Sequence, residues 1–147
     1  MITISAMTEA YVPAAAQLER ECFSEPWSEA SIRSELENPL SLWLIASEGG
    51  RLCGYVGSQT VIDASDMMNI AVAPAFRRQG IGRMLVEELC RSLAGRGSTS
   101  LTLEVRASNE PAKALYASLG FTEAGRRPGY YSRPKEDALI LRKEWQL

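Results

Sequence analysis

The sequence predicts one mixed α/β domain, a sheet flanked by helices, with elements in the order βααβββαβαββ. Three observations support this prediction. The chain has 147 residues, a length typical of one domain. Short runs of strand-like residues alternate with longer runs in which apolar residues recur at helical spacing. No repeat, low-complexity segment or linker interrupts the sequence, so residues 1–147 are expected to fold together.

Polar residues that favour helix starts define two helices in the first third of the chain. Thr8 can cap a helix that runs to about Cys22, because its hydroxyl can accept a hydrogen bond from the first turn. Ser28 can cap a second helix, from Glu29 to Glu37, in the same way. Asn38-Pro39 ends that helix, because proline disfavours helical geometry in the residue before it.

Strand-like segments occupy much of the remaining chain. A turn at Glu48-Gly49-Gly50-Arg51 separates two of these segments and predicts an antiparallel hairpin. A second turn is expected from Asp63 to Asp66. The expected strands are residues 1–6, 42–46, 52–61, 67–72, 101–105, 121–126 and 138–142.

Glycine and proline mark two later helices. Gly80 opens a long helix that runs to about Gly95, and its apolar residues repeat at helical spacing. Asn109-Glu110-Pro111 begins the last helix, because proline is favoured in a first turn, and Leu119-Gly120 ends it. The predicted inner face of the long helix comprises Ile81, Leu85, Val86, Leu89 and Leu93.

The composition excludes several classes of function. The chain has no histidine, so no Ser-His-Asp triad, Cys-His dyad or histidine-ligated metal site can form. The three cysteines lack CxxC spacing, and we expect no bound metal. A net charge of −2 argues against a nucleic-acid partner. No segment approaches the roughly 18 apolar residues of a membrane span. We therefore expect a cytoplasmic protein with no membrane partner.

The most informative segment is 69–83, where a strand ends, a basic loop follows and two glycines begin a helix. Helix N-termini carry unpaired N–H groups and partial positive charge, and glycine lets a phosphate approach the backbone closely. The segment lacks the third glycine of a dinucleotide fingerprint and the Gly-Lys-Ser/Thr of a P-loop. These features alone leave open a phosphate-binding loop and an ordinary helix start.

The pattern Arg-x-x-Gly-x-Gly at positions 77–82 resembles the GNAT superfamily of acyl-CoA-dependent N-acetyltransferases, and the resemblance spans nearly the whole chain. It implies a GNAT fold and acetyl-CoA as co-substrate. In that superfamily the loop and helix start hold the coenzyme A pyrophosphate, and the preceding strand hydrogen-bonds the pantetheine arm and acetyl group. By position, the expected coenzyme-binding residues are Ile70, Ala71, Val72, Arg77, Arg78, Gln79, Gly80, Ile81 and Gly82.

Glu104 and Tyr116 are candidates for acid–base chemistry. Glu104 lies near the C-terminal end of a predicted strand, where open α/β sheets bind ligands. Tyr116 lies two turns into the helix that follows Asn109. A carboxylate can accept the proton of an attacking amine, and a phenol can protonate the departing thiolate. By themselves these residues also fit a surface glutamate and a core tyrosine. The phosphate loop upstream favours the catalytic interpretation.

Further segments narrow the resemblance within the superfamily. They are Phe23-x-x-Pro26-Trp27-Ser28, residues 69–72, residues 103–109, Gly129-Tyr130-Tyr131 and Asp137-Ala138. Together they resemble the RimI family of bacterial ribosomal-protein-alanine N-acetyltransferases. That family acetylates the N-terminal alanine of the eighteenth small-subunit ribosomal protein, so the resemblance implies a ribosomal protein N-terminus as the acceptor.

The resemblance also implies roles for individual residues. Glu104 would be the proton acceptor, Tyr116 the proton donor and Asn109 a coenzyme contact. Trp27 and the pair Tyr130-Tyr131 are expected to line the peptide side, and loop packing is the alternative for them. The acidic residues Glu25, Asp63, Asp66 and Asp137 are candidates for a groove that attracts a basic ribosomal protein.

The chemistry of the acceptor agrees with this resemblance. An α-amine with a pKa near 7.8 is roughly 10% neutral at pH 7, whereas a lysine with a pKa near 10.4 is well under 0.1% neutral. An α-amine therefore needs only a modest base, such as Glu104 acting through water. Two alternatives stay open. One is acetylation of a small-molecule amine by the same fold and coenzyme site, and the other is a non-catalytic CoA-binding module.

Overall fold

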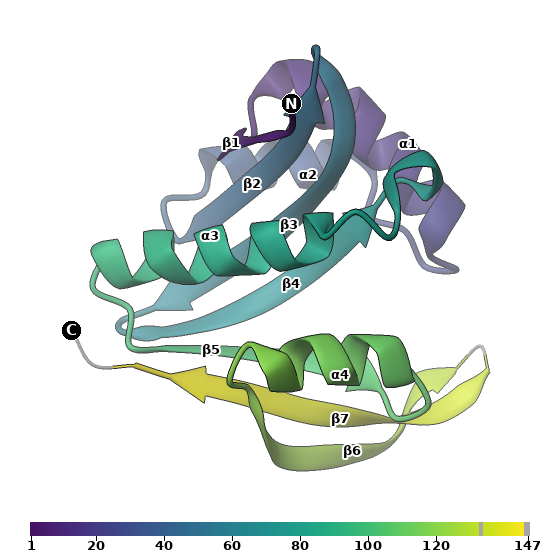
Figure 1. Ribbon diagram of the computed structural model, residues 1–147, viewed down its shortest axis with the longest axis vertical. Coiled ribbons are helices and arrows are strands. Elements are labelled where there is room, and N and C mark those ends of the chain that lie inside the picture. The colour runs from purple at the N-terminus through teal and green to yellow at the C-terminus, as the bar shows by residue number, and fades with distance from the viewer. Residues whose placement is uncertain (133, 146–147) are drawn as a thin grey trace.

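In residues 1–132 and 134–145, which the computed structural model describes, seven strands form one sheet in the order β1-β2-β3-β4-β5-β7-β6 (Figure 1). The predicted order βααβββαβαββ is confirmed, and short 3-10 turns precede two of the helices. The strands are β1 Thr3–Ala6, β2 Ser41–Glu48, β3 Arg51–Val61, β4 Ala64–Val72, β5 Ser100–Arg106, β6 Thr122–Ser132 and β7 Lys135–Glu144.

Helices cover both faces of this sheet (Figure 1). In β2, Leu42 and Leu44 belong to the apolar cluster under α3, whereas Trp43 and Ile45 belong to the cluster under α1 and α2. Successive strand residues point to opposite faces, so β2 is buried on both sides. Among the described residues, no helix is long and apolar enough to cross a membrane. The helices are α1 Val12–Cys22, α2 Glu29–Glu37, α3 Ile81–Gly95 and α4 Glu110–Ser118.

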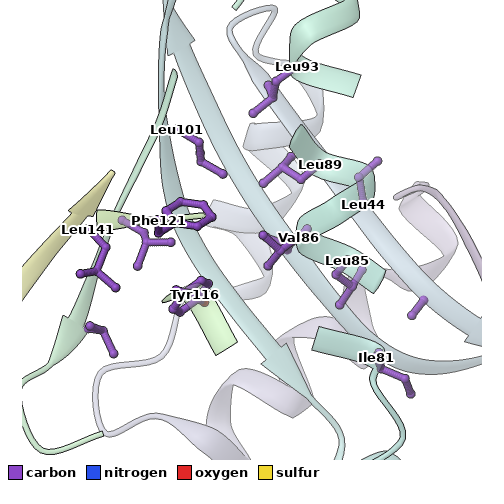
Figure 2. Packing of buried hydrophobic residues seen from close by; sticks show 14 of the residues in the cluster. Leu44, Ile81, Leu85, Val86, Leu89, Leu93, Leu101, Tyr116, Phe121 and Leu141 are labelled. Carbon is purple, nitrogen blue, oxygen red and sulfur yellow. The ribbon is translucent and has the colours of Figure 1, made fainter. Parts of the chain in front are cut away.

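The long helix α3 packs as its sequence pattern predicts. Every residue of its predicted inner face is at most 1% exposed. Figure 2 shows these side chains directed into a cluster that also holds Leu44, Leu101 and Phe121. Burial of an aliphatic side chain of this size contributes about 1.5–3 kcal/mol. The inner face therefore fixes α3, and with it the glycine-rich helix start, against the sheet.

One of the two predicted helix caps is confirmed, and the predicted helix start at Asn109 proves to be capped as well. The Ser28 side chain accepts a hydrogen bond from the Ser31 N–H at 3.0 Å, and the Asn109 side chain accepts one from the Ala112 N–H at 3.2 Å. The cap expected at Thr8 is wrong, because its hydroxyl makes no such bond. Pro13 lies in the first turn of α1 and cannot donate, so the preceding residues Glu9–Tyr11 form a tighter 3-10 turn.

The turn expected over Asp63 to Asp66 is also wrong. Val61 and Ala64 already pair across β3 and β4, so the chain reverses at Ile62 and Asp63. Ile62 adopts a positive φ of 61° there, a backbone conformation that β-branched residues such as isoleucine disfavour. The acidic residue Asp66 instead lies within β4, opposite Thr102 of β5.

The last two strands are longer than predicted. β6 continues past Pro128-Gly129, and its register against β7 shifts between Arg127 and Tyr131. Because β6 is at the edge of the sheet, a proline without an N–H can lie within it at an irregular step. This extension brings Tyr130 and Tyr131 onto a strand instead of a loop.

The parallel strands β4 and β5 are paired along only part of their length. Ala64, Ser65 and Asp66 pair with Ser100, Leu101 and Thr102, and the strands then diverge toward their C-terminal ends (Figure 1). β4 also carries a bulge at Met68, because Met67 and Asn69 pair with adjacent residues of β3. The bulge and the divergence remove backbone pairing from the same stretch of β4, which opens the middle of the sheet.

Candidate active site

A cleft of about 980 Å³ opens where β4 and β5 diverge. We name its two sides by their position in the chain. The N-terminal wall consists of Cys22, Phe23, Ser24, Glu25 and Trp27 with residues 67–70 of β4. The C-terminal wall consists of residues 103–106 of β5, of Asn109, Ala112 and Tyr116, and of Tyr130, Tyr131, Ser132 and Pro134.

The cleft brings together seven of the residues predicted from the sequence. They come from elements far apart in the chain, which meet because β4 and β5 are neighbours in the sheet. These residues are Trp27, Ile70, Glu104, Asn109, Tyr116, Tyr130 and Tyr131.

Glu104 lies on β5, opposite Ile140 of β7, with its side chain 27% exposed. The Nε of Arg127 lies 3.4 Å from a Glu104 carboxylate oxygen. The sequence did not point to Arg127, because it lies on a different strand and belongs to no motif. An ion pair this open to solvent contributes about 1 kcal/mol or less. The Glu104 carboxylate is therefore accessible to an amine that enters the cleft.

Tyr116 lies on the inner side of α4 and is 5% exposed. Its ring packs edge-on against Phe121 at 5.4 Å, and its hydroxyl lies 3.9 Å from the Met67 sulfur across the cleft. Burial, with a smaller contribution from Tyr131, raises the pKa of Tyr116 to about 12. The phenol therefore holds its proton at neutral pH, as a proton donor must.

Tyr130 and Tyr131 form an aromatic pair beside Glu104, with their rings edge-on at 5.1 Å. Burial and the nearby charge of Glu104 raise the pKa of both phenols. Arg127 lies over the Tyr130 ring at 5.5 Å, and Arg106 lies over the Tyr131 ring at 4.3 Å. These contacts hold the two rings at the cleft, and half of the Tyr130 surface stays exposed.

Trp27 lies opposite, on the N-terminal wall. Its ring packs edge-on against Trp43 at 5.4 Å, and its backbone N–H donates to Glu19 at 2.8 Å. Asn69 also lines this wall and donates to Glu19. The sequence reasoning placed Asn69 in the coenzyme-binding strand but gave its side chain no role, and it missed Glu19. One signal was available, because Glu19 stands on the apolar face of α1, in line with Ala15 and Ala16.

The residues predicted for phosphate binding lie outside this cleft, in the loop between β4 and α3. Arg77, Arg78 and Gln79 are exposed, as is Gly80, whose φ of 77° requires the left-handed region. The first hydrogen bond of α3 runs from the Met84 N–H to the Gly80 carbonyl. The N–H groups of the preceding positions therefore have no partner within the helix.

Two arginines of this segment are held by protein groups. Arg77 donates to the Val72 carbonyl at 3.2 Å and to the Cys22 sulfur at 3.5 Å, which turns its side chain back toward β4 and α1. Arg83 donates to the Ser118 hydroxyl at 2.5 Å and so links α3 to α4. Arg78 is exposed and, of the three arginines in this segment, is the one closest in sequence to the left-handed Gly80.

The remaining coenzyme candidates differ in exposure. Ile70 lines the cleft, Val72 is half-buried and Ala71 is 7% exposed. The Ile81 side chain is 1% exposed and packs in the core, so this residue can offer a ligand only its main chain. At Gly82, an added methyl group would meet only Leu115, at 3.7 Å, so the space in front of its backbone is open.

The acidic residues considered for attracting a basic partner do not gather together. Glu25 lines the cleft, whereas Asp63 and Asp66 lie at the opposite, paired end of β4. Asp137 accepts from the Gly129 N–H and from Arg126, and these two contacts lower its pKa. In the described residues, no group of three or more potential ligands could hold a metal ion.

A family model described as the acetyltransferase (GNAT) family matches residues 12–121. The chain belongs to the GNAT acetyltransferase family. This GNAT acetyltransferase is similar to the ribosomal protein bS18-alanine N-acetyltransferase of Salmonella typhimurium, with 44% identity over 144 residues and 96% of each chain covered.

Two solved structures share its fold. The ribosomal-protein-S18-alanine N-acetyltransferase from Escherichia coli has 40% identity and a TM-score of 0.92, over 100% of this chain and 96% of that one. NAA60 of Arabidopsis thaliana, in complex with acetyl-CoA, has 17% identity and a TM-score of 0.88 over 98% of both chains. The second likeness shows the fold alone.

The residues of this GNAT acetyltransferase fit acetyl-CoA, which supplies an acyl group already activated as a thioester. The first N–H groups of α3 have no partner within the helix, Arg78 is exposed shortly before it in the sequence, and the space at Gly82 is open. This arrangement suits a pyrophosphate. The bulged part of β4 leads from this loop into the cleft, where Glu104 and Tyr116 lie.

Proposed function

We propose that this GNAT acetyltransferase transfers the acetyl group of acetyl-CoA to the N-terminal alanine α-amine of ribosomal protein bS18, acting as one domain over residues 1–147 in the cytoplasm. The observation that carries the proposal is the cleft, which holds a carboxylate and a protonated phenol on one wall and a β4 bulge on the other. Relatives at least 40% identical over nearly the whole chain are named for this activity, which supports the acceptor.

Glu104 is the proposed proton acceptor. The α-ammonium of the acceptor gives its proton to the Glu104 carboxylate, directly or through one water, and the neutral amine then attacks the acetyl carbonyl carbon. The incoming ammonium displaces Arg127 as the charge partner of Glu104 before it gives up this proton. As the N–C bond forms, the nitrogen becomes positively charged again and gives a second proton to the same carboxylate, which has by then passed the first to solvent. The exposure of this carboxylate lets the proton pass on to solvent.

Tyr116 is the proposed proton donor. As the C–S bond breaks, its hydroxyl gives a proton to the departing coenzyme A sulfur. Its raised pKa keeps the phenol protonated at neutral pH, so a proton is in place when negative charge develops on the sulfur. The tyrosine then regains a proton from solvent, so that acetyl, amine and protons balance over one cycle.

The coenzyme is proposed to lie along β4 and the start of α3. Ile70, Ala71 and Val72 would meet the pantetheine arm, and the loop of Arg77, Arg78, Gln79, Gly80, Ile81 and Gly82 would hold the phosphates. Asn109 would contact the coenzyme from the other wall. Arg77 must release its bonds to Val72 and Cys22 to reach a phosphate with its side chain, so Arg78 and the backbone N–H groups carry most of this role.

The acceptor peptide is proposed to enter between Trp27 and the pair Tyr130-Tyr131. All three side chains line the same open cleft, and they come from opposite walls. Glu25 adds a negative charge on the N-terminal wall, where it would attract a basic residue that follows the alanine.

The direct test is acetyl transfer to a peptide that begins with Ala-Arg, followed by mass spectrometry and by release of coenzyme A. The expected product carries one acetyl group on the α-amine, and a matched peptide with a blocked N-terminus is not modified. Robust turnover of small amines with none of the peptide would instead indicate a small-molecule enzyme. Tight coenzyme binding with no turnover of any amine would indicate a non-catalytic module.

The same proposal can be tested in cells. Mass spectrometry of ribosomal proteins from cells with and without this gene compares their N-terminal masses directly. Loss of one acetyl group from bS18 alone is the expected result. An unchanged set of N-termini would contradict the proposed acceptor.

A further inference from the structure

Glu19 is a fully buried carboxylate behind the N-terminal wall of the cleft. It lies on α1 and is 0% exposed. One of its oxygens accepts from the Trp27 N–H at 2.8 Å, and the other accepts from the Tyr55 hydroxyl and from the Asn69 side-chain amide. Its three donors come from the segment before α2, from β3 and from β4.

This arrangement is costly for folding. Burial raises the pKa of the Glu19 carboxyl, against the opposing effect of the hydrogen bonds from Tyr55 and Trp27. A raised pKa in the folded state means that stability present at acid pH is lost as the pH rises through that pKa. Ionisation of this buried carboxyl therefore costs folding free energy. An apolar side chain would fill such a place at lower cost, which indicates a role other than stability.

Two of the three donors line the cleft. Trp27 belongs to the segment between α1 and α2, and Asn69 belongs to β4 directly after the Met68 bulge. The Asn69 amide group is oriented at both ends, because its Nδ2 donates to Glu19 and its Oδ1 accepts from the Ile70 N–H at 3.0 Å. Glu19 therefore connects the acceptor-side segment to the strand that leads to the coenzyme loop.

An aromatic stack completes the same connection. The Trp27 ring packs on Trp43, and the Trp43 ring stacks on Tyr55 at 5.9 Å. The Tyr55 hydroxyl then returns to Glu19. The position of Trp27 is thus set twice, through its backbone by the carboxylate and through its ring by the stack.

We propose that Glu19 is a positioning residue that fixes the Trp27 segment against β4 and thereby holds the peptide acceptor at the acetyl group. The proposal rests on the proposed function, because it takes the acceptor to be a peptide N-terminus. Glu19 itself does not line the cleft, so it acts through Trp27 and Asn69.

The Glu19→Gln variant tests this role with little change in size. An amide NH₂ group now faces either the Trp27 N–H or the donors of Tyr55 and Asn69, so at least one donor loses its acceptor. We expect the KM for the peptide to rise about tenfold, the loss of one hydrogen bond to a charged group. We expect the KM for acetyl-CoA to stay within about twofold, because none of the three donors to Glu19 belongs to α3 or to the loop before it.

Glu35 offers a matched control. It is a second buried glutamate, 7% exposed, and accepts from the Ser41 hydroxyl, the Trp43 indole and the Gln59 amide. None of these three donors lines the cleft. In Glu35→Gln the carbonyl oxygen can take the place of Oε1, which accepts from Ser41, Trp43 and Gln59, so the Trp43 indole keeps its acceptor and only the second contact of Gln59, to Oε2, is lost. This variant should therefore lose stability without a rise in the peptide KM. A peptide KM that is unchanged in Glu19→Gln, or raised equally in both variants, overturns the proposal.

A measurement on the unmodified enzyme covers the case in which Glu19→Gln fails to fold. Hydrogen exchange at the Trp27 amide should be much slower than at its exposed neighbours Ser24 and Glu25, because Glu19 accepts its hydrogen bond. Equal exchange rates overturn the proposal. This result does not depend on which amine is acetylated, so it separates failure of the Glu19 role from failure of the proposed acceptor.

Discussion

The two walls of the cleft each depend on a glutamate, and the two glutamates differ in almost every physical respect. Glu19 is 0% exposed and its oxygens receive three donors from neutral groups. Glu104 is 27% exposed and lies near the exposed charge of Arg127. A carboxylate that is filled by donors can hold a structure but cannot exchange protons quickly. A carboxylate open to water can exchange protons but contributes little to fixing the surrounding structure. Burial, not residue type, divides the two roles.

The largest effect is expected at Glu104, the exposed glutamate of the two. Glu104→Gln should lower kcat by about 10²-fold to 10⁴-fold, the range of general base catalysis, because the amide cannot accept the proton of the ammonium. The KM for acetyl-CoA should not change, since Glu104 does not hold the coenzyme. Steady-state kinetics with the Ala-Arg peptide measure both values, and near-normal turnover would remove Glu104 from the mechanism.

Tyr116→Phe should lower kcat by up to about 10²-fold. The effect is smaller than at Glu104, because thiols ionise near pH 8.5 and a thiolate can leave without full protonation. Phenylalanine keeps the edge-on contact with Phe121, so the melting temperature serves as the control for packing. Unchanged turnover in a stable variant would assign the proton donor to water instead.

Gly82→Ala tests a part of the site that belongs to neither wall. Alanine in place of glycine should stabilise α3 by about 0.5–1 kcal/mol, and the added methyl group meets only Leu115, at 3.7 Å. The KM for acetyl-CoA should nevertheless rise about tenfold, the loss of one hydrogen bond to a charged group. Thermal unfolding should show a higher melting temperature, and kinetics should show a higher KM for acetyl-CoA in the same variant. A KM that falls or stays constant would place the phosphates elsewhere.

The smallest expected effect concerns pH. The Tyr116 pKa of about 12 lies above the usual 10, so its contribution to stability is complete below pH 10 and is lost as the pH rises toward 12. Within that window the free energy of unfolding should fall by up to about 1.4 kcal/mol per pH unit from this group. Urea unfolding at pH 9 and pH 11 measures the loss, and Tyr116→Phe should show a smaller one. Equal losses would mean that Tyr116 titrates normally.

Local sequence patterns predicted which helices and strands carry the site. They were less accurate about the residues at which those elements begin and end. The apolar spacing in α3, the cap at Ser28 and the helix start at Asn109 depend on neighbouring residues, and all three predictions are confirmed. The turn near Ile62 and the continuation of β6 through Pro128 were missed. In both places pairing with adjacent strands outweighed the local preference of the residues.

The sequence alone determined the family, the order of the elements and the residue types available for proton transfer. Glu104 and Tyr116 stand in adjoining elements, where a motif can reveal them. Only the tertiary structure decided what surrounds them. It turned Arg77 away from the helix start, brought Arg127 to Glu104 and placed Glu19 behind Asn69, 50 residues away in the chain. Such contacts follow from strand order and packing across the sheet, and no local pattern of residues encodes them.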